Sequence, residues 1–262
     1  MSMRLRMTLL STLFVLGLLL VGCSSSDSDP SQPYGGGGTQ LSADEAEDWT
    51  DQALTMMNEM ALQIPTVAEG DFTQTTVGKN AEAPIWDGDQ QAWIMDETAE
   101  FGDGVGSDSY GEMRVAIWIQ FRNDDGPLPT ALGATELEYR LSSGMTMHNE
   151  DSQGTGDLDY DLETTMLVEY VDGGYNVDGE GAAGIDASYS SGGQTENMSF
   201  DMAWGMDLSV PLNGCPSGSA WVEAAQYRLG ALYDGQGNVA WSLGAPGYEA
   251  SGTDTVPCSS IQ

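Results

Sequence analysis

The chain has 262 residues, of which 41 are acidic and 7 are lysine or arginine, so its formal net charge at pH 7 is −34. A surface of this charge repels nucleic acid and anionic lipid headgroups, which excludes both as electrostatic partners. The scarcity of lysine favours an acidic shell that keeps the protein soluble in salty surroundings. Binding of divalent cations and attraction to a cationic partner are the alternatives.

The first residues have the features of an export signal. Arg4 and Arg6 precede an apolar run over 9–21, which is shorter than the span of about 20 residues that a membrane-crossing helix needs. A basic start, an apolar middle and a small-residue cleavage site are typical of a secretory signal. The site, Leu20-Val21-Gly22-Cys23, resembles the lipobox of bacterial lipoproteins.

This resemblance implies that residues 1–22 are a signal peptide and that the thiol of Cys23 carries the lipid, such as palmitate, that anchors the protein. Each buried CH₂ contributes about 0.8 kcal/mol, so a multiply acylated end stays in the membrane. In the lipoproteins that the site resembles, an aspartate after the cysteine favours the inner membrane. Ser24 stands there, which implies a cell-envelope protein of the outer membrane. An ordinary signal peptide with an unrelated cysteine is the alternative.

A lipidated tether and one domain follow the signal. Residues 23–40 contain almost no apolar side chains after the cysteine, and a flexible segment of this length spans roughly 20–25 Å. In the domain over 41–262, Ser42 and Glu45 form a capping-box signature. Apolar side chains then recur at steps of three and four until Pro65, which predicts an amphipathic helix. The stripe consists of Ala46, Trp49, Ala53, Met56, Met57, Met60 and Ile64.

After residue 90 the apolar pattern repeats every second residue, which is typical of strands with one buried face. The alternation is strongest in 112–122, 134–148, 157–170 and 197–210, and weaker strands fit 91–101, 174–189, 218–233 and 238–245. The connections are rich in Gly, Asp and Asn, as in hairpins. We therefore predict a mainly β fold: an antiparallel meander of about eight long strands, curled into a barrel or half-barrel, with the helix packed on it.

Two cysteines remain once Cys23 is lipidated, and in an exported protein Cys215 and Cys258 most simply form a disulfide. If the last hairpin turns at 234–237, the numbers of paired residues sum to about 471. Cys215 then lies opposite residue 256, two residues from Cys258. The bond would close the open end of this hairpin.

The sequence contains few signals of catalysis. It has no serine in a G-x-S-x-G motif, no phosphate-binding G-x-x-x-x-G-K-[ST] loop, and one histidine, His148, on a polar strand face. We therefore expect a protein that is not an enzyme and needs no cofactor. Calcium is the one ion that the acidic loops suggest, and solvated charge is the alternative. The candidate ligands are Asp103, Asp108, Glu150 and Asp151.

Methionine is the most informative residue, with 14 in the chain. Its flexible, polarizable side chain suits surfaces that adapt to varied apolar ligands. The predicted lining residues are Met56, Met60, Met202 and Met206. The leading hypothesis is a lipoprotein that holds a lipid or other apolar small molecule in this interior, with the helix as a lid. The alternative is a solid-core structural or interaction module of the envelope with an acidic, cation-tolerant or calcium-binding surface.

Overall fold

The computed structural model describes residues 50–58 except 52 and 56, and then 84–102, 109–150, 154–224, 227–245, 247–256 and 258–260. The signal peptide, Cys23, the tether and most of the predicted helix lie outside these residues. The described residues between Thr50 and Asn58 are helical, which covers only a short part of the predicted helix. Nearly all other described residues lie in strands.

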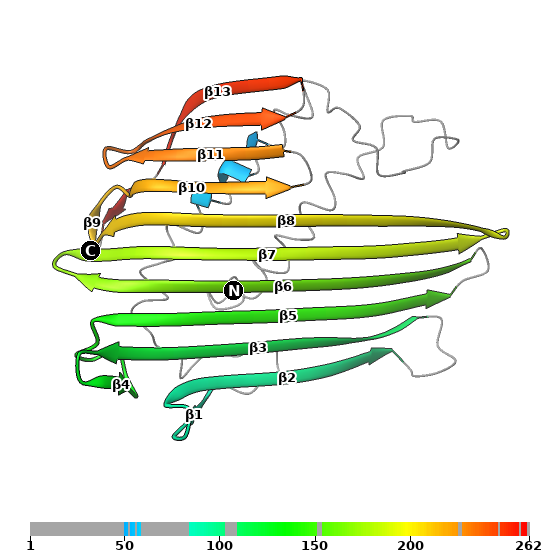
Figure 1. Cartoon of the computed structure of the whole chain (residues 1–262), viewed down its shortest axis with the longest axis horizontal. Coiled ribbons are helices and arrows are strands. Elements are labelled where there is room, and N and C mark those ends of the chain that lie inside the picture. The colour runs from blue at the N-terminus through cyan, green and yellow to red at the C-terminus, as the bar shows by residue number, and fades with distance from the viewer. Residues whose placement is uncertain are drawn as a thin grey trace.

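The main sheet has twelve strands, all paired antiparallel, and their order follows the chain from one hairpin to the next (Figure 1). The order is β1-β2-β3-β5-β6-β7-β8-β10-β11-β12-β13, with β4 paired to β3, while β9 and β14 form a separate pair. The strands are β1 (Ile85–Asp87), β2 (Ala92–Gly102), β3 (Ser109–Asn123), β4 (Gly126–Leu128), β5 (Glu136–Glu150), β6 (Thr155–Val171), β7 (Gly174–Ser191), β8 (Gln194–Pro211), β9 (Asn213–Gly214), β10 (Ser217–Ala224), β11 (Tyr227–Asp234), β12 (Asn238–Ala245), β13 (Tyr248–Thr255) and β14 (Ser259–Ser260).

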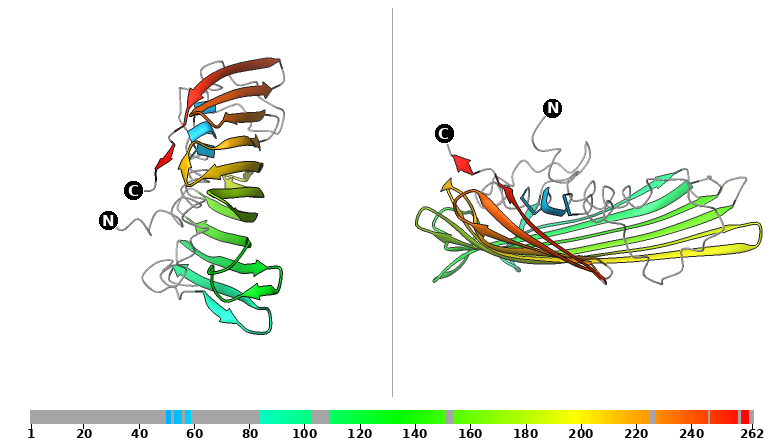
Figure 2. Two further views of the ribbon diagram at one scale, coloured as in Figure 1. Left: turned by 90° about the vertical axis from the view of Figure 1, so that its left-hand side faces the viewer. Right: turned by 90° about the horizontal axis from the view of Figure 1, so that it is seen from above.

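The predicted antiparallel meander is confirmed, but the prediction of about eight strands is wrong. Of the two predicted shapes, barrel or half-barrel, the closed barrel is wrong. The strands at the two ends of the order, β1 and β13, do not pair with each other. The sheet is open and curved, and the helical residues lie over its concave side (Figure 2). The alternation of apolar and polar residues shows that one face of a strand is buried. This pattern is the same in an open sheet and in a closed barrel, so it does not distinguish the two.

The predicted strand over 218–233 is in fact two strands. β10 ends at Ala224 and β11 begins at Tyr227. Buried residues are even-numbered before this point, as at Val222, and odd-numbered after it, as at Leu229. This change of phase is the sequence signal of the hairpin, and it was missed because the connection lacks the Gly, Pro, Asn and Asp of most turns.

One face of the sheet forms the core together with the helical residues. Ala53, Leu54 and Met57 of the helical segment belong to the same buried cluster as the concave-face side chains of β2 to β12. The Tyr233 hydroxyl in β11 donates a hydrogen bond of 3.0 Å to Asn58 Oδ1. Burial raises the pKa of Tyr233, so its hydroxyl remains a donor over the physiological pH range. The helical segment is therefore held against the concave face at β11.

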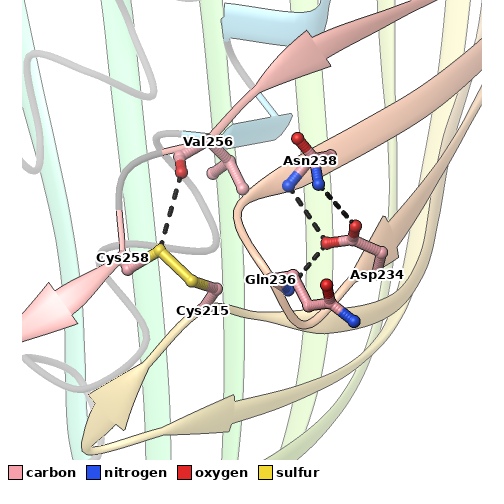
Figure 3. Close-up of a disulfide and its surroundings, with 6 residues drawn as sticks. All are labelled: Cys215, Asp234, Gln236, Asn238, Val256 and Cys258. Atoms are coloured by element: carbon pink, nitrogen blue, oxygen red, sulfur yellow. Dashed lines mark hydrogen bonds between the residues drawn. A yellow bond between two sulfur atoms is a disulfide. The ribbon is translucent and has the colours of Figure 1, made fainter.

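The predicted pairing of Cys215 with Cys258 is present in the structure (Figure 3). The two sulfur atoms are 1.96 Å apart. The register that was expected to place them opposite each other is wrong, because Cys215 precedes β10 and does not lie on β11, the strand that pairs with β12. The cysteines are brought together by β9 and β14, in which Gly214 is opposite Ser259.

The disulfide lies beside the turn between β11 and β12. Asp234 holds this turn by accepting hydrogen bonds from the amide of Gln236 at 2.7 Å and from the amide and side chain of Asn238 at 3.0 and 2.7 Å (Figure 3). These bonds, from the Asn238 side chain first, lower the pKa of Asp234. The disulfide therefore joins the segments that carry β9 and β14, and the hydrogen bonds of Asp234 hold the adjacent turn between β11 and β12.

Candidate functional site

The concave face divides into a packed part and a partly exposed part. In the direct register of β5 to β8, Met147 is opposite Leu158, Leu158 is opposite Ala187, and Ala187 is opposite Met198. We call these four residues the methionine row. It lies near the distal end of the sheet, the end with the turn between β7 and β8 (Figure 1). Met198 is 44% exposed, so the apolar surface reaches solvent.

The next row toward the core shows where burial begins. Tyr160 and Ile185 in β6 and β7 are 7% and 3% exposed, whereas Met145 and Phe200, at the two ends of the row, are half-buried. On the distal side of the methionine row, Tyr189 is 41% exposed. A continuous apolar strip therefore runs from the core to the distal end.

The two predicted lining residues that the structure describes do not belong to the methionine row. Met202 and Met206 are on the concave face, but they are only 3% and 5% exposed and belong to the core cluster. Met206 packs over Gly179, where an added Cβ would lie 3.4 Å from its Cγ. Met56 and Met60 lie outside the described residues, and their neighbour Met57 is buried. Met202 and Met206 therefore share the face of the methionine row but do not lie at its exposed end.

The sequence contains a signal for the exposed end of this face, the glycine pair Gly192-Gly193. Gly192 and Gly193 both have positive φ, and two such glycines between alternating runs predict a two-residue hairpin loop. That loop places Met198 opposite Ala187 by counting outward from the turn. The exposure of Met198 could not be predicted in this way, because the sequence does not show how far the neighbouring elements cover β8 along its length.

The convex face collects carboxylates over β6, β7 and β8. The acidic patch consists of Asp159, Asp161, Glu163, Asp186 and Asp201. Asp159 is directly opposite Asp186, and Asp161 lies over Gly184, where an added Cβ would be 2.7 Å from its Oδ1. Burial first, and then the four other carboxylates of the patch, raise the pKa of Asp161.

The structure gives no support to the predicted calcium ligands and does not test them. Glu150 is exposed at the end of β5, and Asp103, Asp108 and Asp151 lie outside the described residues. Among the residues that the structure describes, no three His, Cys, Asp or Glu side chains are grouped closely enough to hold a metal ion. Calcium binding stays a prediction.

His148 lies opposite Asp157 on the convex face. Its Nδ1 is 2.6 Å from Asp157 Oδ1, and its ring packs against Tyr110 with 4.9 Å between the centroids. The bond from His148 lowers the pKa of Asp157. Ser188 donates its hydroxyl to Asp157 at 3.4 Å and not to the imidazole. The three groups are therefore not arranged as a nucleophile activated by a base.

In the described part of the chain, no helix is long and apolar enough to cross a membrane. Comparison with protein-family models, with curated proteins and with solved structures gives no match to the chain. The geometry of the two faces of the sheet is therefore what indicates a function.

Proposed function

We propose that the protein is a non-enzymatic, lipid-anchored protein of the bacterial envelope that binds an apolar ligand, such as a lipid, on the concave face of its sheet. The observation that carries the proposal is the methionine row. Methionine adapts its shape to a ligand at low cost, and a partly exposed apolar strip next to a packed core is a common form of binding surface. The ligand would lie across Met147 and Met198.

The anchor is the second part of this proposal. The lipobox-like sequence ending at Cys23 and the tether over 24–40 support it. A lipid on the first residue of the mature chain would keep the concave face within reach of the membrane. The Cys23→Ser variant should lose acyl labelling and become soluble or remain uncleaved. Labelling that persists in this variant would show that the anchor is elsewhere.

Ligand binding is tested with an environment-sensitive apolar dye. The Met198→Gln variant keeps the length of the side chain but places a polar amide in the methionine row, and we expect at least about tenfold weaker dye binding. Leu232→Gln is the matched control, because Leu232 is 60% exposed and its register places it on the opposite, convex face of β11. Equal loss in both variants, or no dye binding by the parent, would contradict the proposal.

A second candidate function is that of a solid-core interaction module of the envelope. The observation that favours it is the burial of Met57, Met95, Met202 and Met206, each at most 5% exposed. Native mass spectrometry of protein purified without detergent separates the two candidates. A retained apolar adduct that is lost in Met198→Gln supports the ligand-binding protein, and a bare mass together with absent dye binding supports the module.

A further inference from the structure

The sheet has a step along one side of β8. The first strand beyond it, β10, pairs with only one part of β8, Met202–Ser209. The preceding part of β8, Gln194–Asp201, pairs with β7 and with no other described strand. Figure 1 shows β7 and β8 extending well past the ends of β10 to β13. We call Gln194–Asp201 the open edge.

The backbone direction of the open edge follows from the hairpin. Ser191 and Gln194 close the two-residue loop Gly192–Gly193, and residues that close such a loop exchange both backbone hydrogen bonds. Every second residue from Gln194 then points its N–H and C=O toward β7. The residues between them point theirs to the open side of the sheet. The latter are Thr195, Asn197, Ser199 and Asp201.

The side chains of the open edge differ between the two faces. Met198 and Phe200 are on the apolar concave face, and Met198 is 44% exposed. Asn197, Ser199 and Asp201 are exposed on the convex face, where Asp201 belongs to the acidic patch with Asp161. Glu196, opposite Tyr189, is on the concave face as well. A strand that added beside 198–201 would therefore meet apolar contacts on the concave side and carboxylates on the convex side.

We propose that the open edge binds an extended, cationic segment of another protein by β-strand addition, with alternate apolar and Lys or Arg side chains. Unpaired backbone groups provide the hydrogen bonds of such complexes, and alternate side chains provide specificity. The apolar side chains of the segment contact Met198 and Phe200. Its cationic side chains face Asp201 and the acidic patch. This proposal goes beyond ligand binding by the concave face and does not depend on it.

Charge selects this occupant over a second copy of the chain. Each copy has a formal net charge of −34, and self-pairing of two open edges would bring Asp201 and the acidic patch of one copy beside the edge of the other. Like charges on neighbouring strands are destabilising, and acidic edges are one means by which proteins avoid pairing with themselves. A cationic strand gains from the same carboxylates.

The test uses the full protein and a peptide of alternating lysine and valine, about as long as the open edge. Isothermal titration should show binding that weakens as salt rises, since the charges are exposed. A peptide with glutamate in place of lysine should not bind. A lysine–valine peptide with a central proline should bind at least about tenfold more weakly, because it cannot complete the ladder.

The variant Asn197→Pro removes an outward N–H while leaving the ladder with β7 intact, and it should weaken binding of the lysine–valine peptide at least about tenfold. Ser251→Pro is the matched control. Ala245 and Tyr248 close the hairpin between β12 and β13, so Ser251 has the same outward direction on the outer edge of β13. This variant should bind the peptide as the parent does.

Hydrogen exchange on the parent protein provides a readout that needs no variant. The peptide should slow exchange at the amides of Thr195, Asn197 and Ser199, and should leave Ser251 unchanged. Equal affinity of the parent and Asn197→Pro, or no protection of the open edge, would show that the peptide binds only by charge and would overturn the proposal. A dimer of the parent that Asn197→Pro dissociates would show that a second copy is the occupant.

Discussion

The indole ring of Trp204 in β8 covers Gly181, the residue directly opposite it in β7. A Cβ added at Gly181 would lie 2.5 Å from ring atoms Nε1 and Cε2. Trp221 covers Gly205 in the same way. A glycine weakens a strand because it has no side chain to pack, and an aromatic ring from the neighbouring strand restores the missing contact. The ring of Trp204 thus occupies the space that a side chain at residue 181 would need, and in return it covers the backbone of Gly181.

Gly181→Ala should therefore destabilise the protein, although alanine ordinarily suits a strand at least as well as glycine. Trp204 is 5% exposed, so it has little room to move away, and we expect a loss of about 1–3 kcal/mol in the free energy of unfolding. Gly244→Ala in β12 is the control, because an added Cβ there meets nothing within 4 Å. Urea denaturation measures both. An equal, small effect at the two sites would mean that the ring shifts freely.

Replacing Met202 or Met206 by tryptophan should overpack the core. Both side chains are at most 5% exposed, and we expect each change to cost about 1–3 kcal/mol. Met198→Trp is the matched control on the same face of the same strand, and at 44% exposure it should change stability by less than about 0.5 kcal/mol. Thermal melts of the three variants test this. A cavity beneath the helical residues would instead accept the tryptophans without loss.

Reduction of the disulfide should weaken the whole domain. The cysteines are separated by 43 residues, and closing a loop of this size contributes about 4 kcal/mol in the chain-entropy model. We expect a lower denaturation midpoint in reductant, and a double variant Cys215→Ser, Cys258→Ser whose midpoint no longer responds to reductant. A parent midpoint that is the same with and without reductant would mean that the bond does not limit the unfolded chain.

Asp161 should make stability depend on pH. Its folded-state pKa is raised by burial and by the neighbouring carboxylates, so ionisation costs stability above that pKa, and the cost disappears as pH falls to the ordinary aspartate value. Asp161→Asn should therefore stabilise the protein at neutral pH, with a gain that shrinks as pH falls from about 7 to about 4. Asp207 lies in β8, on the same convex face of the sheet as Asp161 in β6, and Asp207→Asn controls for the general loss of a negative charge. A gain independent of pH would exclude this cause.

The alternation of side chains determined the long strands from β3 to β8 and the faces of their side chains. In β8, Met202, Trp204, Met206 and Leu208 are all buried, as the pattern over 197–210 predicts, because successive residues of a strand point to opposite faces whatever the strand pairs with. The disulfide between Cys215 and Cys258 was also predictable, since these are the only two cysteines left once Cys23 is assigned to the lipid anchor. Both inferences need only local geometry or a count of residues.

The tertiary structure alone decided the shape of the sheet and the lengths over which its strands pair. The sheet stays open, and β10 ends at Ala224, opposite Met202, so that no described strand other than β7 pairs with Gln194–Asp201 of β8. Asp161 meets Asp201 across Gly184. All of these depend on register, twist and strand length. Register, twist and strand length depend on how segments distant in sequence pair with one another. The two-residue alternation of side chains is the same for every such pairing, so it does not reveal which one forms. The two proposed binding surfaces, the methionine row and the open edge, lie where the described strands and helical residues leave the sheet uncovered.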